Sequence, residues 1–155
     1  MPGILKSGSV KNKVNLSQKR IAIVVASWNE EITESLYESA VHTLIANGVK
    51  KDNVIRKSVP GTFELSLGAL WMAEEKNIHA VICLGCVIQG DTPHFDYICQ
   101  AVSYGITEVG LKTGKPVIFG VLTTLTKEQA LERAGGKLGN KGEEAALSVI
   151  EMLSF

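Results

Sequence analysis

Apolar and polar residues alternate along this chain in a regular succession of strand and helix patterns. Continuous apolar runs predict buried strands at residues 20–26, 80–84 and 116–122, and a more interrupted run predicts a strand nearer an edge at 53–59. Apolar residues at helical spacing separate these runs. They predict helices between Asn29 and Asn47, with Asn29 as the cap, and over residues 63–76, 93–112, 126–133 and 143–153.

This order of elements predicts the fold class. Strand and helix alternate four times, which indicates an α/β protein: a three-layer α/β/α sandwich with a four-stranded parallel sheet flanked by helices on both faces. The second predicted helix is apolar around much of its circumference, so we expect Trp71 to lie in the core. Residues 1–19 are polar and lack periodicity, and are predicted to form an N-terminal arm before a single domain at 20–155.

Composition narrows the class of function. Lys plus Arg and Asp plus Glu both number 16, so the formal net charge is zero, which argues against a nucleic-acid-binding protein. No apolar run approaches the roughly 18 residues of a membrane span, and the first residues lack a signal-peptide pattern. The three cysteines cannot all pair with one another, so we expect reduced thiols and a cytoplasmic protein.

The loops that follow the predicted strands hold most of the chain's unusual residues. These loops span residues 27–29, 60–64, 85–94 and 122–126. In parallel sheets, ligands bind beyond the carboxyl ends of the strands, and those ends share one edge. The sequence therefore predicts a ligand site built from these four loops.

The stretch 81–101 carries the clearest candidate chemistry. Its apolar strand is predicted to break at Gly85, and Thr92-Pro93 is a favourable helix start. Unpaired N–H groups at a helix start attract anions, and His94 in the first turn can give and take a proton near neutral pH. Capping or packing is the alternative role for His94. Asp91-Thr92 stands where a nucleotide-binding Gly-rich loop requires Lys followed by Ser or Thr, so an NTPase is disfavoured.

Other candidates each have a structural alternative. Trp28 could stack on a flat ring or pack against the core, and Arg133 could bind an anion or be a solvated helix end. Lys141 is a weaker candidate of the same kind. Cys83-x-x-Cys86 is not expected to bind metal, because it spans a strand end where the two side chains diverge and a second ligand pair is lacking.

Five segments together resemble the lumazine synthase family. They are ASWNEEIT, VPGTFEL, LGCVIQGDTPHFDYIC, VIFGVLTT and ERAGGKLGNKGEEAA, in that family's order and spacing across residues 20–153. The resemblance implies a flavodoxin-like fold and a transferase of riboflavin biosynthesis. The expected reaction condenses 5-amino-6-(D-ribitylamino)uracil with L-3,4-dihydroxy-2-butanone 4-phosphate to give 6,7-dimethyl-8-ribityllumazine, without a metal or another cofactor.

The resemblance also implies roles for individual residues. His94 matches the residue proposed for proton transfer, and Asp91, Thr92 and Arg133 match the phosphate-binding positions. Lys141 matches a less certain contact. Residues matched to the ribitylaminouracil site are Trp28, Thr62, Phe63, Glu64, Cys86, Val87, Ile88 and Phe119. Gln89 departs from the family's usual Arg or Lys, and the acidic Asp91 is compatible with phosphate only if main-chain N–H groups face it.

Assembly is implied by the resemblance alone. The family forms pentamers with active sites between adjacent subunits, and Phe119 matches a residue contributed by the neighbour. Many bacterial members pack twelve pentamers into a 60-subunit shell. A functional link to riboflavin synthase is a further expectation from the resemblance. In the same picture, the N-terminal arm adds a strand to a neighbouring sheet.

Two rival interpretations stay open at this stage. A flavodoxin-like flavin carrier would share the fold and the phosphate at a helix start, although its phosphate loop would be richer in Ser and Thr than GCVIQGDTPH. A catalytically silent shell subunit would use the same residues only for packing. Bound flavin would favour the carrier, and product formation would exclude the silent subunit.

Overall fold

The computed structural model describes residues 14–155 and has a four-stranded parallel sheet at its centre. The strands are β1 (Ile21–Ala26), β2 (Val54–Val59), β3 (Ala80–Ile88) and β4 (Val117–Thr124), in the spatial order β2-β1-β3-β4. All three pairings are parallel, so the carboxyl ends of the strands point the same way. The predicted parallel sheet is therefore confirmed, including β2 as an edge strand.

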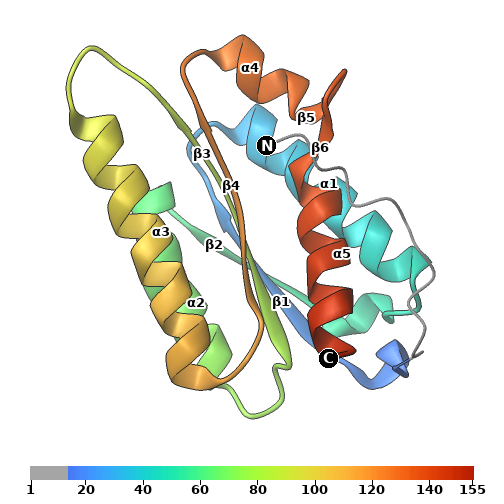
Figure 1. The fold of residues 1–155 in the computed structure, drawn as a ribbon. Helices are drawn as coiled ribbons and strands as arrows, with labels where there is room; N and C mark the ends of the chain where they lie inside the picture. The colour runs from blue at the N-terminus through green and yellow to red at the C-terminus, as the bar shows by residue number, and fades with distance from the viewer. Residues whose placement is uncertain (1–13) are drawn as a thin grey trace.

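Helices cover both faces of this sheet, as Figure 1 shows. On one face lie α2 (Leu65–Glu74), entered through the short helix η3 (Thr62–Glu64), and α3 (His94–Thr113). On the other face lie α1 (Glu30–Ala46), α4 (Lys127–Glu132) and α5 (Lys141–Leu153). The three-layer α/β/α sandwich is confirmed. Smaller elements are η1 (Leu16–Gln18), η2 (Lys51–Asn53) and a hairpin of β5 (Ala134–Gly136) and β6 (Gly139–Asn140), which sequence patterns did not predict.

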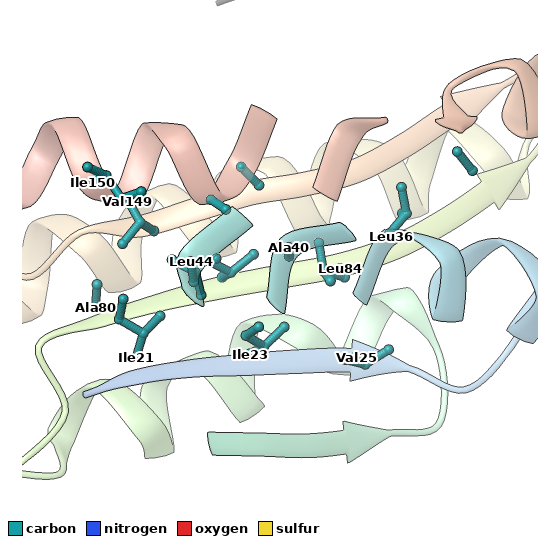
Figure 2. Packing of buried hydrophobic residues seen from close by; sticks show 14 of the residues in the cluster. Ile21, Ile23, Val25, Leu36, Ala40, Leu44, Ala80, Leu84, Val149 and Ile150 are labelled. Atoms are coloured by element: carbon teal, nitrogen blue, oxygen red, sulfur yellow. The ribbon is translucent and has the colours of Figure 1, made fainter. Parts of the chain in front are cut away.

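The sheet divides the core into two apolar clusters, one for each helical layer. All six residues of β1 are buried, because alternate side chains enter opposite layers. Figure 2 shows Ile21, Ile23 and Val25 of β1 on the layer of α1 and α5, with Leu44 and Val149 from those helices. Burial on both faces explains why this strand reads as an unbroken apolar run.

The third strand continues past the predicted break at Gly85. It extends to Ile88, and Cys86, Val87 and Ile88 pair with Leu122, Thr123 and Thr124 of β4. A Cβ at Gly85 would lie 2.7 Å from Thr62 Oγ1 and 2.9 Å from Leu65 Cδ1. The glycine therefore provides room for the start of α2 and does not turn the chain, so the prediction of a break was wrong.

Two further predictions differ from the structure. Trp71 was expected in the core, yet 62% of it is exposed, because α2 buries only the side that faces the sheet and α3. Thr92 was expected to cap the third helix, but α3 begins at His94 with Pro93 in the cap position and without a side-chain capping bond. Both residues were correctly predicted to belong to a helix or its start, but the burial of Trp71 and the capping role of Thr92 were predicted wrongly.

The predicted N-terminal arm is only partly within the described residues. Its first thirteen positions lie outside them, and the arm remains a prediction. From Val14 onward the chain is described: Leu16 is buried against the layer of α1 and α5, and Asn53 Nδ2 donates to Ser17 O at 3.0 Å. Among residues 14–155, no helix combines the length and apolar character needed to cross a membrane.

The crossing of α1 and α5 yields a stability prediction. A Cβ at Gly142 would overlap the Leu36 carbonyl oxygen and lie 2.7 Å from the Leu36 carbonyl carbon. Both are backbone atoms, so one of the two helices would have to move to make room. We expect Gly142→Ala to lower the free energy of unfolding by about 1–3 kcal/mol, measured by denaturant titration.

Gly110→Ala is the matched control, because Gly110 lies within α3 and its nearest neighbour to a new Cβ is 3.5 Å away. There, alanine should be neutral or add up to about 1 kcal/mol through helix propensity. Equal unfolding curves for the two variants would contradict the tight crossing.

Candidate functional site

The loops at the carboxyl ends of β1 and β2 are hydrogen-bonded to each other. Ser27 N donates to Val59 O at 2.9 Å, and Trp28 N donates to Pro60 O at 3.1 Å. The loop after β1 is thereby fixed against the Pro60-Gly61 turn. Trp28 is 67% exposed at this position, so the aromatic face predicted for ring stacking is accessible in the chain.

The end of β3 joins the same group through one carbonyl. Cys86 O accepts a hydrogen bond from Asn29 Nδ2 at 3.0 Å and lies 3.4 Å from the donating Thr62 Oγ1. Asn29 holds a left-handed backbone, with φ 59° and ψ 45°, that asparagine tolerates better than most residues. Asn29 occupies the predicted cap position of α1, but its side chain makes no capping bond, so the prediction is confirmed only for the position. The side chain links two strand ends instead.

The segment after β2 presents three different side chains. Thr62 is buried, Phe63 is 54% exposed, and Glu64 is half-buried. Glu64 Oε2 accepts a hydrogen bond from Gly61 N at 3.0 Å, so one oxygen of this carboxylate has a structural role at the start of η3. Its other oxygen, Oε1, makes no hydrogen bond within residues 14–155, and can accept one from a ligand.

Beyond Ile88, the chain leaves the sheet and reaches the start of α3. Val87 and Ile88 are half-buried, whereas Asp91, Thr92 and His94 are exposed. Gln89 N donates to Thr124 O at 2.9 Å, which holds the beginning of this loop beside β4. The loops after β1, β2 and β3 therefore lie together at one edge of the sheet, as predicted. The start of α3 follows the β3 loop directly in the chain.

Arg133 belongs to a separate group of charges. Its Nη2 donates to Glu144 Oε1 at 3.1 Å, and its Nη1 donates to Leu138 O at 3.1 Å. Lys141 Nζ donates to Glu144 Oε2 at 3.1 Å, so two cations share one carboxylate. The group carries a net positive charge and a pre-oriented guanidinium. It lies at the end of α4 and the start of α5, on the opposite face of the sheet from α3 (Figure 1).

Phe119 is also separated from the group around Trp28. In the sheet register, Phe119 and Val24 both pair with Cys83, so Phe119 lies two strands away from β1 and below its carboxyl end. Its side chain is half-buried against the layer of α2 and α3. Within one chain, therefore, Phe119 does not join the predicted residues around Trp28, and Arg133 is grouped with Lys141 instead.

The surroundings of all three cysteines favour the protonated thiol. Burial raises the pKa of Cys83 to about 12 and that of Cys86 to about 11, while burial and the nearby Asp96 raise the pKa of the half-buried Cys99. Cys83 faces the layer of α2 and α3 and Cys86 faces the opposite layer, which confirms that the C-x-x-C side chains diverge. Within residues 14–155, His, Cys, Asp and Glu form no cluster suited to a metal ion.

Sequence reasoning missed the roles of three residues that organise these groups. Gly61 lies under the Trp28 indole, Asn29 holds Cys86 O, and Glu144 holds Arg133. The spacing of Lys141 and Glu144, three positions apart on a helix, is a recognised ion-pair pattern and could have indicated Glu144. Sequence offered no signal for Gly61 or Asn29, since both contacts are between loops far apart in the chain.

Comparisons with known proteins agree on one family. A sequence profile described as 6,7-dimethyl-8-ribityllumazine synthase matches residues 18–155. A 6,7-dimethyl-8-ribityllumazine synthase of Cytophaga hutchinsonii is 67% identical over 90% of this chain and 88% of the relative. Proteins with the same name from Parabacteroides distasonis and Bacteroides fragilis are 55% and 51% identical, over 90% and 88% of this chain and 87% and 95% of each relative.

The thiol environments yield a prediction about pH. A raised pKa keeps a thiol protonated, so the thiolates of Cys83 and Cys86 should form in the native protein only as the pH approaches 11 to 12. We expect neither to react with a disulfide reagent at pH 8, whereas all three cysteines should react after unfolding in guanidinium. Cys99→Ser isolates the two buried thiols, and their rapid modification at pH 8 in that variant would contradict this assignment.

Proposed function

The chain belongs to the 6,7-dimethyl-8-ribityllumazine synthase family, and on that premise we propose how its residues form the active site. The protein condenses 5-amino-6-(D-ribitylamino)uracil with L-3,4-dihydroxy-2-butanone 4-phosphate, the penultimate step of riboflavin biosynthesis. The observation that carries the proposal is the joining of the β1, β2 and β3 ends through Pro60 O and Cys86 O, beside an exposed aromatic ring.

The ribitylaminouracil lies against Trp28 in this proposal. The exposed indole offers a flat face of the size of a pyrimidine ring, and stacking of this kind is worth on the order of 1 kcal/mol beyond area burial. Thr62, Phe63, the free oxygen of Glu64 and the main chain of Cys86, Val87 and Ile88 surround the ring edge and the ribityl chain. These segments already adjoin Trp28 through the hydrogen bonds described above, which supports the assignment.

The butanone phosphate lies at the start of α3. This helix has 20 residues, and its first main-chain N–H groups carry the positive end of its dipole. Asp91 and Thr92 line the approach, with main-chain N–H groups facing the phosphate. His94, exposed in the first turn, lies where it can transfer a proton at the carbon next to the carbonyl.

A neighbouring subunit supplies the remaining residues. Phe119 lies about 10 Å from β1 across two strand spacings, and Arg133 lies on the other face of the sheet from α3. We infer that neither contacts the substrates held by its own chain. We assign Phe119 to the ring, and Arg133, with Lys141 as a weaker contact, to the phosphate of the adjacent subunit's site. Glu144 keeps the Arg133 guanidinium oriented before substrate arrives.

The chemistry then follows from holding the two substrates together. The ring amine attacks the butanone carbonyl, and loss of water gives an imine. A proton leaves the adjacent carbon as the phosphate departs, and the resulting enol tautomerises. The second amine closes the new ring with loss of another water. Nucleophile, electrophile and leaving group all come from the substrates, so the protein contributes mainly proximity and orientation, with proton transfer by His94.

The family assembles as an oligomer, and we propose a cytoplasmic pentamer that packs into a 60-subunit shell alongside riboflavin synthase. Exposed apolar side chains on α2 and α3 support extensive association: Leu67, Trp71, Tyr97, Tyr104 and Leu111. Sixty copies of a 16.7 kDa chain correspond to a particle of about 1 MDa.

Light scattering tests the shell and should give a mass of about 1 MDa for the particle. The mass of a single pentamer would refute the shell, but it would not contradict an active site shared between adjacent subunits.

Substitutions at Arg133 and His94 separate phosphate binding from proton transfer. Arg133→Ala should raise the KM for the butanone phosphate by about 10–100-fold, because charge-assisted bonds to the phosphate are lost. His94→Ala should lower kcat by no more than about 10²-fold, the lower end for a general acid–base group, because orientation dominates. Both are measured by following product fluorescence while each substrate is varied in turn.

Lys112→Ala is the control for charge, since Lys112 lies in the last turn of α3, far from the proposed phosphate position. It should leave both KM values unchanged. Normal use of the phosphorylated substrate by Arg133→Ala would remove Arg133 from the site, and absence of product formation by the unmodified protein would refute the proposed function itself.

A further inference from the structure

The indole of Trp28 lies directly against the main chain of Gly61. A Cβ added at Gly61 would lie 2.7 Å from Trp28 Cε3 and 2.8 Å from Trp28 Cζ3, closer than real Cβ atoms approach their neighbours. Gly61 is buried, whereas Trp28 is 67% exposed. One part of the ring is therefore covered by the Gly61 peptide, and much of the remainder is accessible.

Backbone conformation does not explain the glycine. Gly61 has φ −130° and ψ 178°, an extended conformation that any residue adopts. Glycine is needed at this position because a side chain would lack space. The six-membered part of the Trp28 indole occupies the position that a side chain would take. This distinguishes Gly61 from Gly48 and Gly114, whose positive φ values call for glycine regardless of space.

Both partners of this contact are fixed. Trp28 N donates to Pro60 O at 3.1 Å, which ties the residue bearing the ring to the turn bearing the glycine. Gly61 N donates to Glu64 Oε2 at 3.0 Å, which ties the glycine to η3. A side chain at position 61 could not be accommodated by moving the backbone away, so the indole would have to rotate or tilt.

We propose that Gly61 is a positioning residue: its bare peptide sets the tilt of the Trp28 indole and thereby the fit of the pyrimidine that stacks on it. This inference rests on the proposed stacking role of Trp28. It concerns the ribitylaminouracil alone, because Gly61 has no part in holding the butanone phosphate. Glycine at this position is thus a determinant of specificity for the flat substrate.

Gly61→Ala tests the inference through the two substrates. The KM for 5-amino-6-(D-ribitylamino)uracil should rise about 10-fold as the ring is displaced, while the KM for the butanone phosphate stays within about twofold. A general loss of folding would change the amount of active protein and not split the two KM values in this way. Gly110→Ala, where a new Cβ makes only ordinary van der Waals contacts, should leave both KM values unchanged.

Rescue by a smaller ring provides the second test. A phenyl ring lacks the outer atoms of the indole. The fold-increase in the uracil KM caused by Gly61→Ala should therefore be smaller in a Trp28→Phe background than in the unmodified protein, by at least several-fold. An equal increase in both backgrounds would overturn the positioning role of Gly61.

A spectroscopic test keeps the inference independent of turnover. With Trp71→Phe, Trp28 is the one remaining tryptophan, and its emission reports on its own environment. Gly61→Ala in this background should shift the Trp28 emission maximum and weaken its quenching by the uracil substrate. An unchanged spectrum would also overturn the inference. Failure of the proposed function gives a different result. If Trp28 does not stack on the substrate, Trp28→Ala leaves the uracil KM unchanged, even though the emission of Trp28 still responds to Gly61→Ala.

Discussion

The carbonyl oxygen of Cys86 is the point on which the arrangement of the site depends. It lies near the end of β3 and is approached by side-chain donors from the loops after β1 and β2, namely Asn29 at 3.0 Å and Thr62 at 3.4 Å. Each such bond contributes only about 1 kcal/mol, but together they fix three loops that are distant in the chain. The loops around the candidate site are therefore held together by the protein's own polar groups.

Close approach of main chains is the companion constraint. Gly61 admits the Trp28 ring, Gly85 admits the start of α2, and Gly142 admits the α1 backbone. In each case a single methyl group would collide with a neighbour. Two of the three contacts, at Gly61 and Gly85, position Trp28 and the Thr62–Glu64 segment. The rim is thus shaped as much by the absence of side chains as by the residues that would touch substrate.

The positions of Phe119 and Arg133 support the proposed site between adjacent subunits. Within one chain both lie apart from the group around Trp28, yet Arg133 is already oriented by Glu144 and Leu138 O. The site that we propose between subunits would bring these groups together without requiring a long loop. It would also couple activity to association, because neither subunit alone would hold the complete set.

The sequence by itself determined the parallel sheet, its edge strand, the helical layers and the family, because burial on two faces and short-range spacing leave direct marks on residue order. Its failures have a common cause. Asn29 looked like a helix cap, Gly85 like a turn and Trp71 like core, since local rules assign a residue to its nearest element. Only the tertiary structure decided that Asn29 holds Cys86 O, that Gly85 makes room for Thr62 and that Trp71 faces outward, because each outcome depends on a segment remote in sequence that packs, or does not pack, against the residue.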